Sequence, residues 1–442
     1  MPRFRQTGNY FYCQRKQRGA ALMVMLVIMV MGAATILVNS LSSTALQIKR
    51  DKISADALAQ AKEALIGYAA SVKFTGGAER PGDLPCPDTN NDGIAEASCG
   101  NASGSTGQNL RLGRLPWKTL GLPDLRDGSG ERLWYAISNN FKKNTRTALL
   151  NSDTPGTITV FASNDNILYN GDTTVGTGAV AVIIAPGDVL QRTDKTTPQD
   201  RSSTGVNAPE NYLDIALGED NANFMDGSST NGFIQGRIKD NSGNVILNDQ
   251  LLVVTQNDIM QPMQRRVAAE VKQCLSDYAA QGQNKGLYPW AAKLDGSTAP
   301  SYADVSGSLF GRLPDTFTDT VSDSGGGMKD GWTTSCNMNL GSWWNNWKEM
   351  MFYGLADAYK PVNPPSTPTT CPTCLTVNPP SATADKKFVV IVAGKKLAGQ
   401  MRSSNADKGS LGNYLETPNS GGATAFAQGT FSTTFNDTVL FQ

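Results

Sequence analysis

A polar loop between two cysteines carries the side chains of this chain that are best suited to binding a metal ion. Oxygen-bearing side chains stand there at alternate positions, Asp88, Asn90 and Asp92, and are followed by Gly93 and then Glu96. Calcium in proteins takes about six to eight oxygen ligands, and this spacing matches the first half of a calcium-binding loop. The twelfth position of such a loop, usually a bidentate glutamate, is Cys99 here, so Glu96 would serve at the ninth. We predict that the four oxygen side chains bind calcium; a surface loop of Asx turns is the alternative.

The cysteines predict disulfides rather than thiol chemistry. Seven occur, of which Cys13 lies near the amino terminus and six follow it. An even number favours disulfides in a chain that leaves the reducing cytoplasm. Two pairs are close in sequence and the third is left by elimination: Cys86 with Cys99, Cys371 with Cys374, and Cys274 with Cys336. The Cys-Pro-Thr-Cys segment also has the spacing of a thioredoxin active site, but prolines surround it and no helix pattern follows, which favours a structural clasp.

Composition removes several classes of function. The 442 residues include no histidine, which excludes Ser-His-Asp and Cys-His nucleophilic pairs and imidazole-based metal sites. Neither a GxxxxGK[ST] nor a GxGxxG phosphate loop is present. Basic and acidic residues are equal, at 39 each, so no net charge draws the chain onto nucleic acid. We expect a protein that is not an enzyme and does not bind nucleic acid.

The elements that would position these residues begin with an amino-terminal helix. Residues 1–19 contain five basic residues and no acidic ones, and Ala20 to Val38 contain no charge. A bilayer-spanning helix needs about 20 apolar residues, and the basic flank stays in the cytoplasm. We predict a single transmembrane helix over 20–41, in contact with lipid of the bacterial inner membrane, with the head periplasmic or extracellular. A plain signal anchor and a signal peptide cleaved near residues 43–45 are the alternatives.

Helical spacing continues beyond this segment. One apolar stripe with intervals of mostly three or four contains Leu41, Ala45, Ile48, Ala55, Leu58, Ala61, Leu65, Tyr68 and Val72. No proline interrupts it. The pattern predicts that the amino-terminal segment and an amphipathic stem form one long helix.

The junction of Arg18 and Gly19 with the uncharged segment resembles type IV prepilins and type II secretion pseudopilins. In that family a prepilin peptidase cleaves after the glycine, which implies cleavage after Gly19 and an N-methylated Ala20 as the new terminus. The resemblance also implies partners that are other pilin or pseudopilin subunits, contacted through the amino-terminal helix. Most pilins carry glutamate at the fifth mature position, where this chain has Val24. Some minor pseudopilins at filament tips also lack that glutamate.

Five short motifs occur twice in the same order and indicate a tandem duplication. They are residues 65–70 with 275–280, 113–116 with 311–314, 133–137 with 351–355, 180–185 with 388–393, and 211–214 with 413–416. Each half would hold a helix followed by a small antiparallel sheet. The predicted fold class is α+β, with a long N-terminal transmembrane and amphipathic helix before two tandem pilin-like halves. The predicted boundaries are 1–19 leader, 20–41 transmembrane helix, 42–220 stem and first half, 221–250 polar linker, and 251–442 second half.

A tryptophan cluster, Trp343, Trp344 and Trp347, allows two interpretations. On a helix, Trp343 and Trp347 share a face while Trp344 points about 100° away. Packing in the core of the second half is favoured. The alternative is an exposed surface that binds a partner subunit or a carbohydrate.

These observations predict a non-enzymatic, membrane-anchored pilin-like or pseudopilin-like subunit of a type IV pilus or type II secretion filament, at its tip. One alternative is a standalone anchored surface adhesin that uses the duplicated head as a ligand module. A second is a periplasmic hydrolase that uses carboxylates.

Overall fold

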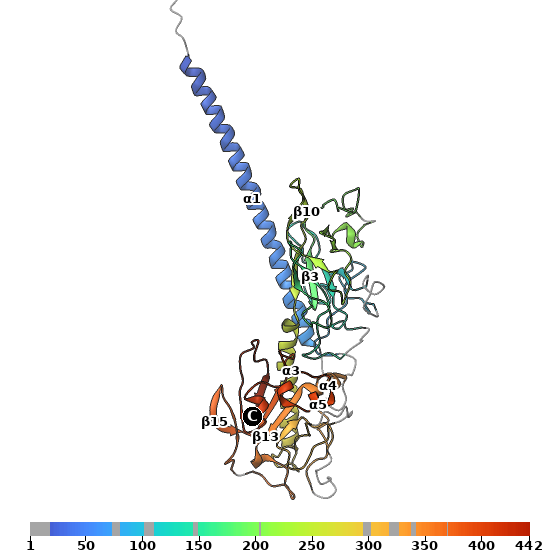
Figure 1. The fold of residues 1–442 in the computed structure, drawn as a ribbon, viewed down its shortest axis with the longest axis vertical. Helices are drawn as coiled ribbons and strands as arrows, with labels where there is room; N and C mark the ends of the chain where they lie inside the picture. Colours follow the sequence, from blue (N-terminus) through green and yellow to red (C-terminus); the bar gives the residue numbers. More distant parts are fainter. Residues whose placement is uncertain are drawn as a thin grey trace, which may run out of the picture. The chain divides into compact units, whose positions relative to one another are not determined.

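A computed structural model describes residues 18–72, 80–100, 110–144, 149–202, 205–294, 302–317, 327–336, 342–368 and 370–442. The chain divides into two units, Met1–Ile53 and Ser54–Gln442. Figure 1 traces the helices and strands in sequence colours.

Helix α1 (Arg18–Ser71) is a single helix of 54 residues and is the long blue ribbon in Figure 1. Within the second unit, its buried residues recur at the helical spacing expected of one apolar face: Ala57, Leu58, Ala61, Leu65 and Ala69. This part of the helix therefore belongs to the core of the second unit.

The transmembrane helix predicted over residues 20–41 was wrong, and with it the prediction of a single-pass inner-membrane protein whose amino terminus is cytoplasmic. Within the residues that the structure describes, no helix carries a stretch long and apolar enough to cross a membrane. The prediction relied on the length of the uncharged run from Ala20 to Val38 and on the basic residues before it. In the structure this stretch begins a helix that continues without a break into the charged residues from Lys49 onward.

Two four-stranded antiparallel sheets have the same connectivity. The strands of the first, in spatial order, are β1 (Leu112–Arg114), β2 (Trp134–Ile137), β5 (Ala181–Ala185) and β11 (Gln250–Val254). Those of the second are β12 (Phe310–Arg312), β13 (Met351–Leu355), β16 (Phe388–Val392) and β18 (Thr438–Phe441). We call residues 54–254 the first repeat and residues 255–442 the second repeat.

The register of the two sheets is also the same. Gly113 lies opposite Tyr135 in the first, and Gly311 lies opposite Tyr353 in the second. The hydroxyl of each tyrosine donates to a proline carbonyl, at 3.1 and 3.2 Å. A Cβ on Gly113 would lie 2.6 Å from the carbonyl oxygen of Asp88, because that backbone pairs with the edge of β1. The close approach of two backbones explains the glycine at this position of the motif.

Smaller sheets complete each repeat. In the first these are β4 (Ile167–Tyr169) with β3 (Val160–Phe161) and β8 (Phe233–Ile234), β6 (Ile215–Ala216) with β7 (Glu219–Asp220), and β9 (Ile238–Lys239) with β10 (Val245–Leu247). In the second they are β15 (Ser381–Lys386), β14 (Leu375–Val377) and β17 (Ala425–Phe426). The β3–β8 and β14–β17 pairs are parallel.

The predicted fold class therefore needs a second correction. We expected one small antiparallel sheet in each half, but the described residues form six sheets, and two of them contain a parallel pair. Strands of two or three residues are too short to show a period of two in the sequence, which is why the pattern did not reveal them. The stretch 221–250, predicted as a polar linker, contains β8, β9 and β10 and buries Phe224, Phe233 and Leu247.

The boundary between the repeats is a single residue. Strand β11 ends at Val254, and helix α3 (Gln256–Ala280) begins two residues later, with Thr255 as its N-cap. The Thr255 side chain accepts a hydrogen bond from the Asp258 backbone N–H, and the Asp258 carboxylate accepts one from the Thr255 N–H, which makes a capping box. Because β11 pairs with β5, the chain completes the first sheet before it enters α3.

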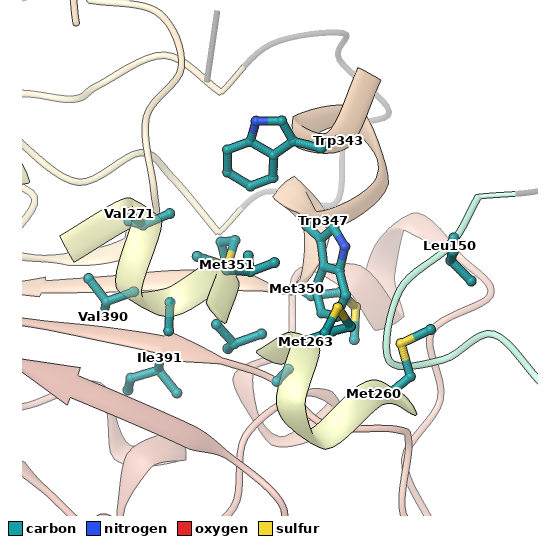
Figure 2. Packing of buried hydrophobic residues seen from close by; sticks show 14 of the residues in the cluster. Leu150, Met260, Met263, Val271, Trp343, Trp347, Met350, Met351, Val390 and Ile391 are labelled. Atoms are coloured by element: carbon teal, nitrogen blue, oxygen red, sulfur yellow. The ribbon is translucent and has the colours of Figure 1, made fainter. Parts of the chain in front are cut away.

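One hydrophobic core includes residues of both repeats. Helix α3 lies against β16 and β18, and its Met260, Met263 and Val271 are buried. Figure 2 shows these side chains among core residues of the second repeat, namely Trp343, Trp347, Met350, Met351, Val390 and Ile391. Leu150 of the first repeat lies beside Met260 in the same view. The two repeats are therefore packed as one body.

Candidate functional site

The exposed apolar face of α1 is the first candidate site. Four large side chains in the Met1–Ile53 unit are 59 to 72% exposed: Met25, Leu26, Met29 and Val30. Their spacing of one and four residues places them on adjoining parts of one helix face. Large apolar side chains exposed together on a helix mark a surface that another protein or a lipid covers. Gly19 and Ala20, the predicted processing residues, lie in the first turn of the same helix.

The 88–96 loop folds around the carboxylate of Asp88, which is 1% exposed. Its Oδ1 accepts hydrogen bonds from the N–H groups of Asn90 (3.2 Å), Asn91 (2.6 Å) and Asp92 (3.3 Å). Its Oδ2 accepts one from Gly93 at 2.7 Å. Burial raises the pKa of Asp88, while the bonds from Gly93 and Asn91 act in the opposite direction.

The other predicted calcium ligands also accept hydrogen bonds from the loop itself. Asn90 Oδ1 accepts from the Asp92 N–H, and Asp92 Oδ1 accepts from the Ile94 N–H. Glu96 Oε1 accepts from both the N–H and the hydroxyl of Thr89, at 3.2 and 2.8 Å. The Asn90 and Asp92 contacts are those of Asx turns, and the Glu96 contacts join the two ends of the loop. Within the described residues, no group of three or more acidic or cysteine side chains is arranged to hold a metal ion, and calcium binding stays a prediction.

Gly93 has φ +84°, and a Cβ there would lie 2.6 Å from Nε1 of Trp117. The glycine therefore serves two purposes, because it turns the loop and lets the loop approach the indole.

The six cysteines of the head form three disulfides: Cys86–Cys99, Cys274–Cys336 and Cys371–Cys374. These are the pairs that the sequence analysis predicted. The first joins the two ends of the 88–96 loop, and the second ties α3 to the segment that contains Trp332. The third closes a short loop that precedes β14.

The tryptophan cluster is part of the core. Trp343, Trp344 and Trp347 lie on or beside α4 (Ser342–Trp347) and are 1, 3 and 0% exposed. The alternative interpretation, an exposed binding surface, was wrong. Trp344 is accommodated because its Nε1 donates to Asp315 Oδ2 at 3.0 Å, which satisfies the polar edge of the indole.

Two buried carboxyl pairs were not identified from the sequence. In the first repeat, Asp249 Oδ2 accepts from the Asp214 N–H (2.9 Å) and from Asn221 Nδ2 (2.8 Å). Burial raises the pKa of Asp214 to about 6, and burial together with the charge of Asp214 raises the pKa of Asp249 well above its usual value.

The second repeat contains the equivalent pair. Asp437 Oδ2 accepts from the Glu416 N–H (3.1 Å) and from Asn419 Nδ2 (2.9 Å). Burial, with the charge of Glu416, raises the pKa of Asp437 well above its usual value. Each repeat has one such pair, and both pairs are almost fully buried. They therefore fit a role in holding the loops of each repeat rather than in acting on a substrate. The signal in the sequence was the doubled Asn-Tyr-Leu-acid motif that contains Asp214 and Glu416.

Comparison of the chain with protein-family models, with curated proteins and with solved structures finds no match.

Proposed function

We propose that this chain is a non-enzymatic structural subunit of a filament of the type IV pilus or type II secretion class. The single observation that carries the proposal is helix α1. Its amino-terminal part exposes Met25, Leu26, Met29 and Val30, while its carboxy-terminal part is buried in the head. A subunit that assembles through one helix and presents a folded head requires this division of one helix into two parts.

The occupant of the exposed face is the same face of other subunits. Apolar surface removed from water contributes about 25 cal/mol per Å², so association of such helices is favourable. The sequence has no charged residue from Ala20 to Val38, so this face offers no ion pairs to a specific polar partner. Val24 stands where most pilins carry glutamate, which fits a minor subunit at a filament tip.

Crosslinking tests the proposal. Met29→Cys in a Cys13→Ser background gives the full chain one added thiol, because the other six cysteines are paired. A bis-maleimide should then yield covalent dimers. Asp165→Cys, at an exposed position of the head, is the matched control and should stay monomeric. If Met29→Cys gives no more dimer than Asp165→Cys, α1 does not associate with α1 of another subunit.

Processing supplies a separate test. Cleavage after Gly19 by a prepilin peptidase should leave Ala20 as a methylated amino terminus, measured by mass spectrometry of the mature protein. A terminus near residue 46 would remove the prepilin assignment.

A further inference from the structure

A cavity of about 460 Å³ opens on the first repeat, on the side of the first sheet that carries Trp134. Leu112, Trp134 and Phe224 supply its apolar wall. Arg114, Glu210 and Asn223 are among its polar residues. A volume of this size accommodates a small ligand.

The second repeat provides an internal comparison, because the same place there is filled. The residue equivalent to Leu112 in the sheet register is Phe310, whose ring stacks on Phe426 with centroids 5.5 Å apart. The buried asparagines Asn221 and Asn419 align the loops, so Phe224 corresponds to Gly422. A Cβ on Gly422 would lie 3.1 Å from the Phe310 ring, so that ring occupies the space.

The polar rim is also specific to the first repeat. Alignment of Tyr212 with Tyr414 pairs Glu210 with Gly412, and the loop alignment pairs Asn223 with Gly421. Glu210 and Asn223 are exposed at the mouth. The second repeat therefore lacks both the space and the side chains that could hold a ligand.

A buried donor points to hydrogen bonding inside the cavity. Trp134 is 1% exposed, and its Nε1–H has no acceptor among the described residues. A buried donor without an acceptor costs free energy, so such groups are normally satisfied. The equivalent residue in the second repeat is Phe352, whose ring has no N–H group. The donor is thus present where the cavity is present and absent where it is filled.

Charge restricts the class of ligand. The Arg114 guanidinium is stacked between the rings of Trp134 and Tyr212, 4.4 and 4.0 Å from their centroids, and donates to two backbone carbonyls. This cation disfavours a cationic ligand, while the carboxylates of Glu210 and Asp88 disfavour an anionic one. The wall is too polar for a hydrocarbon. A neutral ligand that carries both donors and acceptors on a carbon frame fits all of these groups.

We infer that this cavity binds one saccharide unit. A sugar hydroxyl accepts the hydrogen bond from Trp134 Nε1–H, and other hydroxyls donate to the side-chain oxygens of Glu210 and Asn223. The C–H face of the ring packs on Pro209 and Ala222, the partly exposed apolar residues of the lining. This binding goes beyond assembly through α1 and uses none of the same residues.

The experiment uses the full chain with glucose, galactose, mannose and N-acetylglucosamine, followed by saturation-transfer NMR and tryptophan fluorescence. At least one sugar should bind with a dissociation constant on the order of 1 mM, as expected for a ligand of this size. Trp134→Phe copies the second repeat and should weaken binding about tenfold, because the N–H donor is lost together with one ring of the indole. Leu112→Phe also copies the second repeat and should abolish binding by filling the cavity.

Leu168→Phe, the same change at an exposed position of β4, is the matched control and should bind as the wild type does. Near-ultraviolet circular dichroism establishes that each variant is folded, and Trp134→Phe decides the matter if Leu112→Phe does not fold. The inference is overturned if no sugar binds the wild type, if Trp134→Phe and Leu112→Phe bind as well as Leu168→Phe, or if acetate or phosphate binds there in place of the sugars.

Discussion

Asp153 of the first repeat accepts two hydrogen bonds from Nη1 of Arg402 of the second, at 2.9 and 2.8 Å. Asp153 Oδ1 accepts a third from the Lys396 backbone N–H at 2.8 Å. The Arg402 side chain is 5% exposed, and it also donates to backbone carbonyls around it. This ion pair links the two repeats, which share one hydrophobic core.

Arg402→Gln should lower the free energy of unfolding by about 3 kcal/mol, because it leaves a partly buried carboxylate and several carbonyls without their donor. Asp153→Asn should cost about 1 kcal/mol, since Arg402 keeps its backbone acceptors. Urea unfolding followed by circular dichroism measures both. Equal losses in the two variants would show that the ion pair, rather than the carbonyl contacts, accounts for the effect.

The buried carboxyl pair of the first repeat should make stability depend on pH. The folded-state pKa of Asp249 is raised, so the folded chain keeps a proton that the unfolded chain releases above pH 4 or so. Stability from this group is therefore full at low pH and falls as pH rises toward its folded pKa, by up to about 1.4 kcal/mol per pH unit.

Asp249→Asn cannot titrate at this position. The free energy of unfolding of the wild type relative to this variant should fall as the pH rises above about 4, and the equivalent pair of the second repeat cancels in the difference. A pH-independent difference would mean that Asp249 ionises in the folded protein as it does in the unfolded chain.

The three disulfides should differ in their contributions according to the chain that each closes. The sequence separations are 62 for Cys274–Cys336, 13 for Cys86–Cys99 and 3 for Cys371–Cys374. The chain-entropy relation gives about 4, 3 and 2 kcal/mol in that order. Paired Cys→Ala variants compared by urea unfolding measure the ranking. A larger loss at Cys371–Cys374 than at Cys274–Cys336 would contradict it.

Calcium, if it binds the 88–96 loop, should raise the melting temperature at millimolar concentration by mass action on the folded state. Asp92→Ala should remove this rise. Asp88→Ala should also melt earlier in chelator, because four backbone N–H groups lose their acceptor. Asp240→Ala, which breaks an Asx turn elsewhere, is the control and should keep the rise. Identical melting of the wild type in calcium and in chelator would leave the loop as a disulfide-held turn.

The doubled motifs were informative in the sequence because each marks a position with a strict requirement. Gly113 and Gly311 lie where another backbone approaches the edge strand. Arg114 and Arg312 each lie between two aromatic rings, within 4.4 Å of both centroids. Such residues tolerate little change, so the two copies remain similar there and differ elsewhere.

Other features could not be obtained from the sequence. Asp214 and Asp249 are 35 residues apart, and nothing local indicates that the Asp249 carboxylate meets the Asp214 backbone in the interior. The 221–250 stretch is polar because Asn221 and Asp226 are buried with hydrogen-bond partners, and composition alone cannot distinguish such residues from a solvated linker.

Lys62 of α1 donates to the carbonyl of Val253, 191 residues later, at 3.1 Å and forms an ion pair with Asp258 at 2.8 Å. A ribosome that adds about 5 to 20 residues per second delivers these partners roughly 10 to 40 s after the helix. Until then the stripe of α1 that ends in the core lacks the last strand of the first sheet, β11, and helix α3. The newly made helix is therefore open to chaperones, and to other nascent chains, for far longer than a helix takes to form.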